Sequence, residues 1–73
     1  MVPEKQTRIR IDLAIIVNLI DDHSKVLDLG CGDGELLEVL IRDKQCTGHG
    51  IEIHNQLICS CIKKGVDVIQ GDI

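Results

Sequence analysis

The chain contains no phenylalanine, tyrosine or tryptophan among its 73 residues. A core built without aromatic rings must be aliphatic, and the side chains that most often stack on a nucleobase are missing. The formal net charge is −4 and no basic stripe runs along the sequence, so the positive surface that a phosphate backbone requires is missing too. The sequence therefore predicts no nucleic acid as a direct partner.

The sequence also lacks a Cys-x-x-Cys pair and a long apolar run. Cys59 and Cys61, two of the four cysteines, are two positions apart in an expected helix and point to nearly opposite sides. The three histidines are not at metal-ligand spacing, so we expect reduced cysteines and no metal site. The longest apolar run, residues 13–20, contains Asn18 and is shorter than the ~20 residues that span a bilayer, and residues 1–8 show no signal-peptide pattern. We therefore expect a cytoplasmic protein that does not enter a membrane.

A chain of this length forms one small domain. Residues 1–10 are predicted to be a flexible lead-in to a domain at residues 11–73, with a helix at residues 11–20 for which a buried strand is the competing interpretation. The remaining pattern predicts strand 25–29, helix 34–43, strand 47–53, helix 55–64 with Asn55 as its N-cap, and strand 66–70. The helix at residues 55–64 is expected to bury Leu57, Ile58, Cys61 and Ile62. This is an α/β fold: the Rossmann-like βαβαβ half of a doubly wound fold, a parallel sheet of strand order 3-2-1, preceded by an N-terminal helix.

The most informative segment, residues 26–34, is typical of a buried strand that runs through a glycine-rich turn into a helix. Glycines at alternate positions allow a sharp turn and let a ligand approach the backbone closely, and these are Gly30, Gly32 and Gly34. A dinucleotide fingerprint would place its third glycine at position 35, which is Glu35. Asp28, a carboxylate inside a strand, repels phosphate and suits a ligand with a cationic amino group. The segment favours S-adenosylmethionine over NAD and disfavours the alternative of an NAD-type oxidoreductase.

Acidic residues fall at the ends of the later strands, where the ligand of such a sheet binds. Glu52 comes about twenty residues after the glycine turn, where a carboxylate can accept the hydroxyls of a ribose. Asp72 is a candidate acceptor for an adenine amino group, with Ile73 covering the ring edge. His54 lies either along the ribose or adenine or on the surface, and Asp33 is expected to cap the following helix.

The predicted cofactor-binding residues are Asp28, Gly30, Cys31, Gly32, Gly34, Glu52, Ile53, Asp72 and Ile73. A small residue is all that the turn requires at Cys31. We predict no metal ligand and no catalytic residue in this chain.

Three segments resemble the motifs of class I S-adenosylmethionine-dependent methyltransferases. Val-Leu-Asp-Leu-Gly-Cys-Gly-Asp-Gly at residues 26–34 looks like their first motif, Gly-Ile-Glu-Ile at 50–53 like their second, and Gln-Gly-Asp-Ile at 70–73 like their third. The combined run, from Arg-Ile-Asp-Leu at residues 10–13 onward, is similar to the methionine biosynthesis protein MetW family.

The resemblance implies a binding site for S-adenosylmethionine or S-adenosylhomocysteine. In it Asp28 and the turn at Gly30 would hold the methionine end, Glu52 the ribose hydroxyls and Asp72 the adenine amino group. It also implies a link to methionine biosynthesis through a homoserine acyltransferase, as a partner or activator. The alternative function is therefore a regulatory module that binds such an acyltransferase and transfers no methyl group itself.

The expected sheet ends after its third strand, whereas a full class I domain continues with further strands that supply most of the acceptor pocket. We therefore expect that this chain alone is not catalytically competent. The first strand would have an unpaired apolar edge, and such an edge invites pairing with another chain. The sequence thus predicts self-association through the edge of the first strand.

Overall fold

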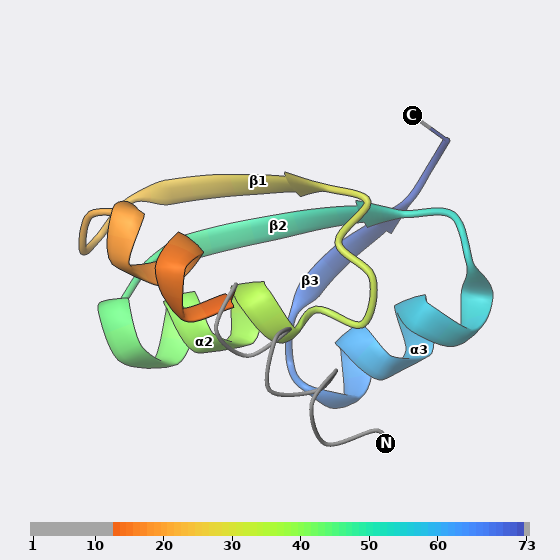
Figure 1. The fold of residues 1–73 in the computed structure, drawn as a ribbon. Coiled ribbons are helices and arrows are strands. Elements are labelled where there is room, and N and C mark those ends of the chain that lie inside the picture. The colour runs from red at the N-terminus through yellow and green to blue at the C-terminus, as the bar shows by residue number, and fades with distance from the viewer. Residues whose placement is uncertain (1–12, 73) are drawn as a thin grey trace, which may run out of the picture.

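The computed structural model describes residues 13–72, and the predicted lead-in at residues 1–10 and Ile73 lie outside the described residues. Strands and helices alternate along the chain (Figure 1). They are β1 (Lys25–Leu29), α2 (Glu35–Lys44), β2 (Thr47–Glu52), α3 (Asn55–Lys63) and β3 (Asp67–Gln70). The predicted βαβαβ unit is confirmed.

The three strands form one parallel sheet in the spatial order β1-β2-β3. Read from the other edge this is the predicted order 3-2-1. In the register Asp28 lies beside Gly50, which lies beside Val68. Successive side chains of a strand point to opposite faces, so these three residues share one face of the sheet.

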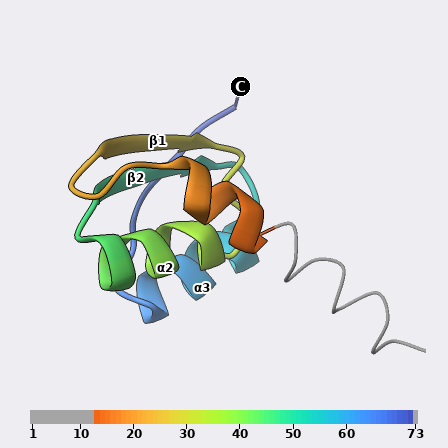
Figure 2. The ribbon, with the colours of Figure 1, turned by 60° about the vertical axis from the view of Figure 1, so that its left-hand side comes forward.

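The helices within residues 13–72 lie on that same face, beneath the sheet in Figures 1 and 2. Leu37 and Leu40 of α2 and Cys61 of α3 are fully buried there. Two inner-face positions of the middle strand, Gly48 and Gly50, have no side chain: a Cβ added to Gly48 would lie 2.7 Å from Leu37 Cδ2. The glycines of β2 therefore let α2 pack directly on the backbone of the sheet.

The opposite face of the sheet has no helix against it among residues 13–72 (Figure 2). Leu29, Ile51 and Ile69 form one row across the three strands in the register. Leu29 is 55% and Ile69 62% exposed, and Leu27, two residues earlier on β1, is 61% exposed. We call this surface the outer face and the helix-covered surface the inner face.

Residues 13–19 form a further helix, which confirms the predicted helix over the competing strand for the part that is described. Its C-terminal carbonyls are capped from α2, because Lys44 Nζ donates to the carbonyl oxygens of Val17, at 2.7 Å, and Ile20. Ile15 and Leu19 on the same helix are exposed. No helix within residues 13–72 is long and apolar enough to cross a membrane.

Three sequence expectations need correction at α3 and β3. Asn55 is not the N-cap: His54 holds that position, and Asn55 Oδ1 accepts a hydrogen bond from Gln70 Nε2 at 2.6 Å. Ile62, expected in the core, is 63% exposed because the sheet contacts only the face of α3 that carries Cys61. β3 begins at Asp67 rather than at residue 66.

Candidate functional site

The glycine loop, residues 30–34, connects β1 to α2. Its glycines all have left-handed backbone angles, with φ of +72° at Gly30, +62° at Gly32 and +84° at Gly34. The loop starts against the neighbouring strand, since the N–H groups of Gly30 and Cys31 donate to the carbonyl of Ile51 at 2.8 and 3.1 Å. L-residues rarely adopt these angles, so the alternating glycines set the path of the loop.

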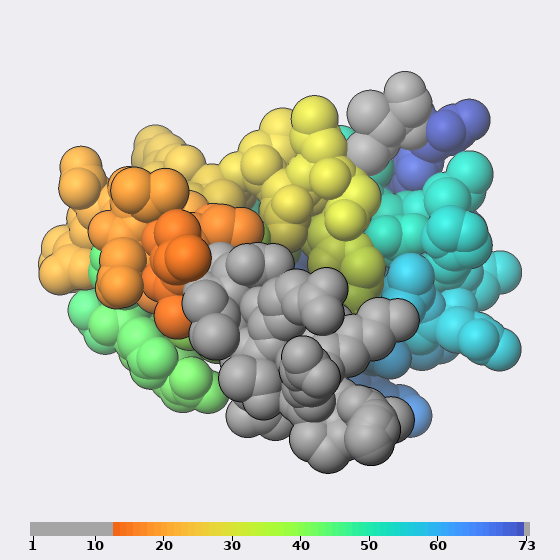
Figure 3. Space-filling view, viewed as in Figure 1, coloured from red at the N-terminus to blue at the C-terminus, as the bar shows by residue number. Residues whose placement is uncertain are grey.

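One side of the glycine loop is open. A Cβ added to Gly30 or Gly32 would meet no atom of the described chain within 4 Å, whereas one on Gly34 would lie 3.0 Å from Cys61 Sγ. The segment that leads from β1 into the loop, yellow in Figure 3, reaches the surface. Gly30 and Gly32 therefore present bare backbone to a ligand, and Gly34 is required for packing.

The other side of the glycine loop is fixed to α3 by sulfur contacts. Cys31 Sγ lies 3.8 Å from Cys61 Sγ, and Cys61 Sγ donates to the carbonyl of Gly32 at 3.2 Å. Burial and the contact with Cys61 raise the pKa of the Cys31 thiol to about 11. Cys31 is thus a protonated core residue, and its side chain is directed to the inside of the loop and not to the open side.

All four cysteines are free in the structure. Cys59 is exposed and Cys61 buried, so the two point to different sides of α3. Residues 13–72 contain no group of side chains that could hold a metal ion.

A lysine also fixes the glycine loop to α3. Lys64 Nζ donates to the backbone carbonyl of Asp33 at 3.1 Å and to its Oδ2 at 3.0 Å, and this hydrogen bond lowers the pKa of Asp33. Asp33 Oδ1 accepts from the N–H of Glu35, the first residue of α2, at 3.2 Å, although the N-cap position itself is held by Gly34 and not by Asp33. The sequence does not predict this contact, because the reach of Lys64 to a loop 31 positions earlier depends on the tertiary fold.

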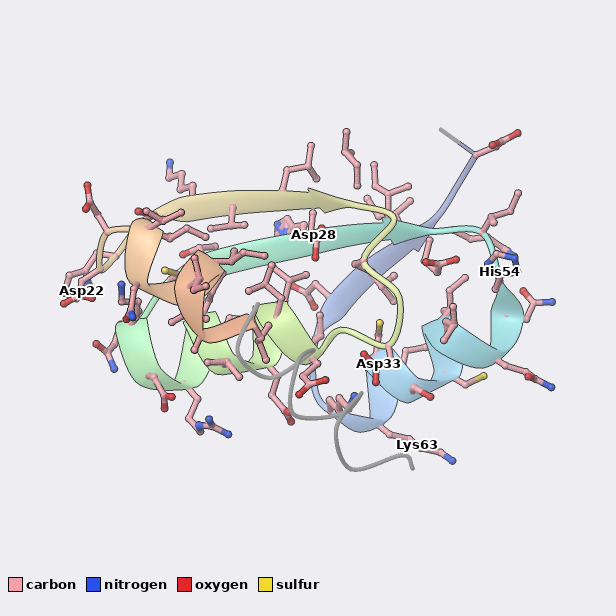
Figure 4. All side chains as sticks on the ribbon, in the orientation of Figure 1. Asp22, Asp28, Asp33, His54 and Lys63 are labelled. Atoms are coloured by element: carbon pink, nitrogen blue, oxygen red, sulfur yellow. The ribbon has the colours of Figure 1, made fainter. Side chains whose placement is uncertain are left out.

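Asp28 lies on the inner face of β1, and its side chain points from the strand toward the helix layer (Figure 4). It is half-buried, and burial raises the pKa of its carboxyl group. Within residues 13–72 no donor is hydrogen-bonded to this carboxylate. After burial and the contact with Cys61, the charges of Asp28 and Glu52 also raise the pKa of the Cys31 thiol.

Glu52, at the end of β2, is buried and bonded through both oxygens. Oε1 accepts from the N–H of Gly32 at 2.9 Å. Oε2 accepts from the N–H of Ile53 at 3.0 Å, and from the N–H and Nδ1 of His54 at 3.1 and 2.7 Å. The hydrogen bonds from the backbone and then the imidazole of His54 lower the pKa of Glu52 to about 2. The structure thus brings Glu52 to the glycine loop, as an ionised link between the loop and the start of α3.

The remaining predicted site residues lie around the same end of the sheet. Ile53 is 49% exposed directly after β2. Asp72 is exposed and follows Gly71, whose N–H donates to the carbonyl of Glu52 at 3.1 Å. The structure therefore places the chain of Asp72 beside the end of β2, while Ile73 lies outside the described residues.

A protein-family model matches the part of the chain that contains this site. Residues 10–73 match the model described as methionine biosynthesis protein MetW. The chain belongs to the MetW family. The match covers the glycine loop, Glu52 and Asp72, and so includes every residue of the site described above.

A curated relative of this MetW-family chain is the bifunctional methionine biosynthesis protein MetXA/MetW of Rhodopirellula baltica. The two are 35% identical over 74 aligned residues, which are 89% of this chain and 12% of the relative. The chain thus spans about an eighth of the length of that relative.

Solved structures share the fold. S-adenosylmethionine-dependent methyltransferases from Thiobacillus denitrificans, in complex with S-adenosylhomocysteine, and from Archaeoglobus fulgidus superpose with TM-scores of 0.74 and 0.73. They are 28% and 29% identical to this MetW-family chain and match 82% and 90% of it, which is 28% and 29% of their own chains. A third such enzyme, from Geobacter sulfurreducens, also holds S-adenosylhomocysteine and gives a TM-score of 0.63 at 30% identity, over 82% of this chain and 28% of its own. The class I methyltransferase fold is therefore confirmed for the described part of the chain.

Proposed function

We propose that this chain forms the S-adenosylmethionine site of a cytoplasmic MetW-family protein and also binds S-adenosylhomocysteine. One observation carries the proposal. The open side of Gly30 and Gly32 lies at the end of β1, and Asp28 on that strand has no hydrogen-bond partner among residues 13–72. A half-buried carboxylate of this kind is stabilised by a cationic partner, and the amino group of the methionine moiety is one.

The residues present fit the cofactor along its length. Bare backbone at Gly30 and Gly32 leaves room for the methionine end beside Asp28. Glu52 Oε1 accepts one hydrogen bond and has a second acceptor position for a ribose hydroxyl. The candidates for contacts with the adenine are Ile53, Asp72 and Ile73, of which Ile73 lies outside the described residues.

When bound, S-adenosylmethionine supplies an electrophilic methyl group. The proposal gives the residues of this chain the task of holding and orienting the cofactor, which is how binding contributes to a transfer reaction. It assigns no side chain of this chain a role in the transfer, and the methyl acceptor is not part of the proposal.

The test is calorimetric titration of the chain with S-adenosylhomocysteine. We expect binding by the wild-type chain and a dissociation constant that is about tenfold higher in Asp28→Asn, because a charge-assisted hydrogen bond is lost. Asp43→Asn is the matched control, since Asp43 lies exposed on α2 and pairs with Arg42, away from the glycine loop. Binding of NADH, or no binding of S-adenosylhomocysteine by the wild-type chain, would contradict the proposal.

A second candidate function is the regulatory module that binds a homoserine acyltransferase. The observation that favours it is the curated relative, in which MetXA and MetW are joined in one bifunctional protein. If this chain activates the acyltransferase, and the Glu52→Ala variant activates it equally well, the regulatory function is favoured over a cofactor-dependent one. Failure of the two proteins to co-purify would oppose it.

We also propose that the chain self-associates through β1. Within residues 13–72 this strand pairs only with β2, and Leu27 and Leu29 on it are exposed. A free strand edge with apolar side chains favours pairing with another chain. Sedimentation velocity at increasing concentration tests this, and a monomer at every concentration would contradict it.

A further inference from the structure

His54 makes an unusual contact for an exposed residue. Its side chain is 73% exposed at the start of α3, yet Nδ1 lies 2.7 Å from Oε2 of the buried Glu52 (Figure 4). His49 on the outer face is also exposed and near a carboxylate, but its Nδ1 lies 3.9 Å from Asp67 Oδ2, which is too far for a hydrogen bond. The imidazole of His54 is therefore directed inward to one acceptor, which is not expected of a surface residue.

The contact continues through Glu52 into the glycine loop. Within residues 13–72, Oε2 receives three donors, of which the imidazole is the only side chain, and Oε1 receives the N–H of Gly32. Because a carboxylate is planar, a donor that holds Oε2 limits the directions that Oε1 can take. The ring at position 54 therefore acts together with the backbone N–H groups of Gly32, Ile53 and His54 to set where the remaining acceptor position of Oε1 points.

We propose that His54 is a positioning residue of the cofactor site. It holds the Glu52 carboxylate so that Oε1 binds Gly32 and keeps one acceptor position for a vicinal diol such as that of a ribose. This inference rests on the proposed function, since it names the residue that orients the ribose acceptor of that same site. Preorganised acceptors bind a ligand more tightly because less ordering is needed on binding.

The test compares His54→Ala, His54→Asn and His49→Ala in titrations with S-adenosylhomocysteine. We expect the dissociation constant to rise about fivefold in His54→Ala, less than for a charged hydrogen bond made directly to the ligand because the lost bond acts only through Glu52, and to return to within about twofold of the wild-type value in His54→Asn, whose amide can donate in place of Nδ1. His49→Ala is the matched control and should bind as the wild type does. Equal affinities of the wild type and His54→Ala would overturn the inference.

A second readout separates positioning from folding. Hydrogen exchange at the Gly32 amide, measured by NMR, should quicken in His54→Ala and recover in His54→Asn, while the amides that pair β1 with β2 keep their protection. Unchanged exchange at Gly32 would also overturn the inference. If the wild-type chain binds no S-adenosylhomocysteine, the proposed function fails, and the Gly32 amide still decides whether His54 orders Glu52.

Discussion

The inner and outer faces of the sheet carry similar aliphatic side chains in opposite surroundings. On the inner face, Leu37 is fully buried against the bare backbone of Gly48. On the outer face, Leu27 is 61% exposed although it belongs to the same short strand as the half-buried Val26. The hydrophobicity of a side chain alone therefore does not show whether it stabilises this domain. What matters is whether the side chain packs against a second layer.

The largest expected effect comes from a pair of identical substitutions on the two faces. Leu37→Ala should lower the free energy of unfolding by about 2–5 kcal/mol, because a fully buried side chain leaves a cavity. Leu27→Ala should change it by less than about 0.5 kcal/mol, as at other exposed positions. Urea unfolding followed by circular dichroism measures both. Similar losses at the two positions would show that the outer face is covered in solution.

The second largest effect on stability concerns the close packing of α2 and the glycine loop against β2. A Cβ at Gly50 would lie 2.4 Å from Cys31 Sγ and 2.8 Å from Cys31 Cβ, so Gly50→Ala must displace the glycine loop. We expect a loss of about 1–3 kcal/mol in unfolding free energy, as for overpacking, together with weaker binding of S-adenosylhomocysteine. His49→Ala, one residue away on the outer face, should change neither. A Gly50→Ala chain with wild-type stability would contradict the packing described here.

The third prediction compares carboxylates on the two faces under acid. The folded pKa of Glu52 is about 2, below its ordinary 4.5, so the unfolded state binds more protons between these values and the free energy of unfolding rises with pH there. The stabilisation by Glu52 is therefore complete above pH 4.5 and is lost as the pH falls toward about 2. Glu52→Gln should lack this part of the pH profile, while Asp67→Asn on the outer face should keep it. Parallel profiles of the wild type and Glu52→Gln would rule out the low pKa.

Much of the inner layer could be predicted from the sequence because local signals agree with the fold there. The alternating glycines, the strand before them and the helix after them all specify one strand–loop–helix unit, and β1 has the predicted bounds Lys25–Leu29. The prediction that Ile62 is buried was wrong, because helical periodicity indicates an apolar face but not how much of that face a three-stranded sheet covers.

The contacts around the glycine loop could not be predicted from the sequence. The pairs Cys31–Cys61, Asp33–Lys64 and Gly32–Glu52 join positions that are 20 to 31 residues apart, and only the packing of α3 and β2 brings them together. The role predicted for Glu52, a ribose contact, left out its bonds within the protein. A carboxylate with an apolar neighbour on each side gives no local signal that a loop amide will reach it.

The smallest expected effect comes from replacing two basic residues: Lys64, which bonds the glycine loop, and Arg42 on the exposed side of α2. Lys64 is the less exposed of the two, with 28% of its side chain accessible against 63% for Arg42, and it bonds a backbone carbonyl as well as a carboxylate. Lys64→Met should therefore lower the unfolding free energy by about 0.5–1 kcal/mol, at the upper end for such pairs, and Arg42→Met by much less. Urea unfolding at low and high salt measures both. Equal effects of the two substitutions would mean that Lys64 adds nothing beyond a surface ion pair, and that the contacts with Glu52, Ile51 and Cys61 hold the glycine loop without it.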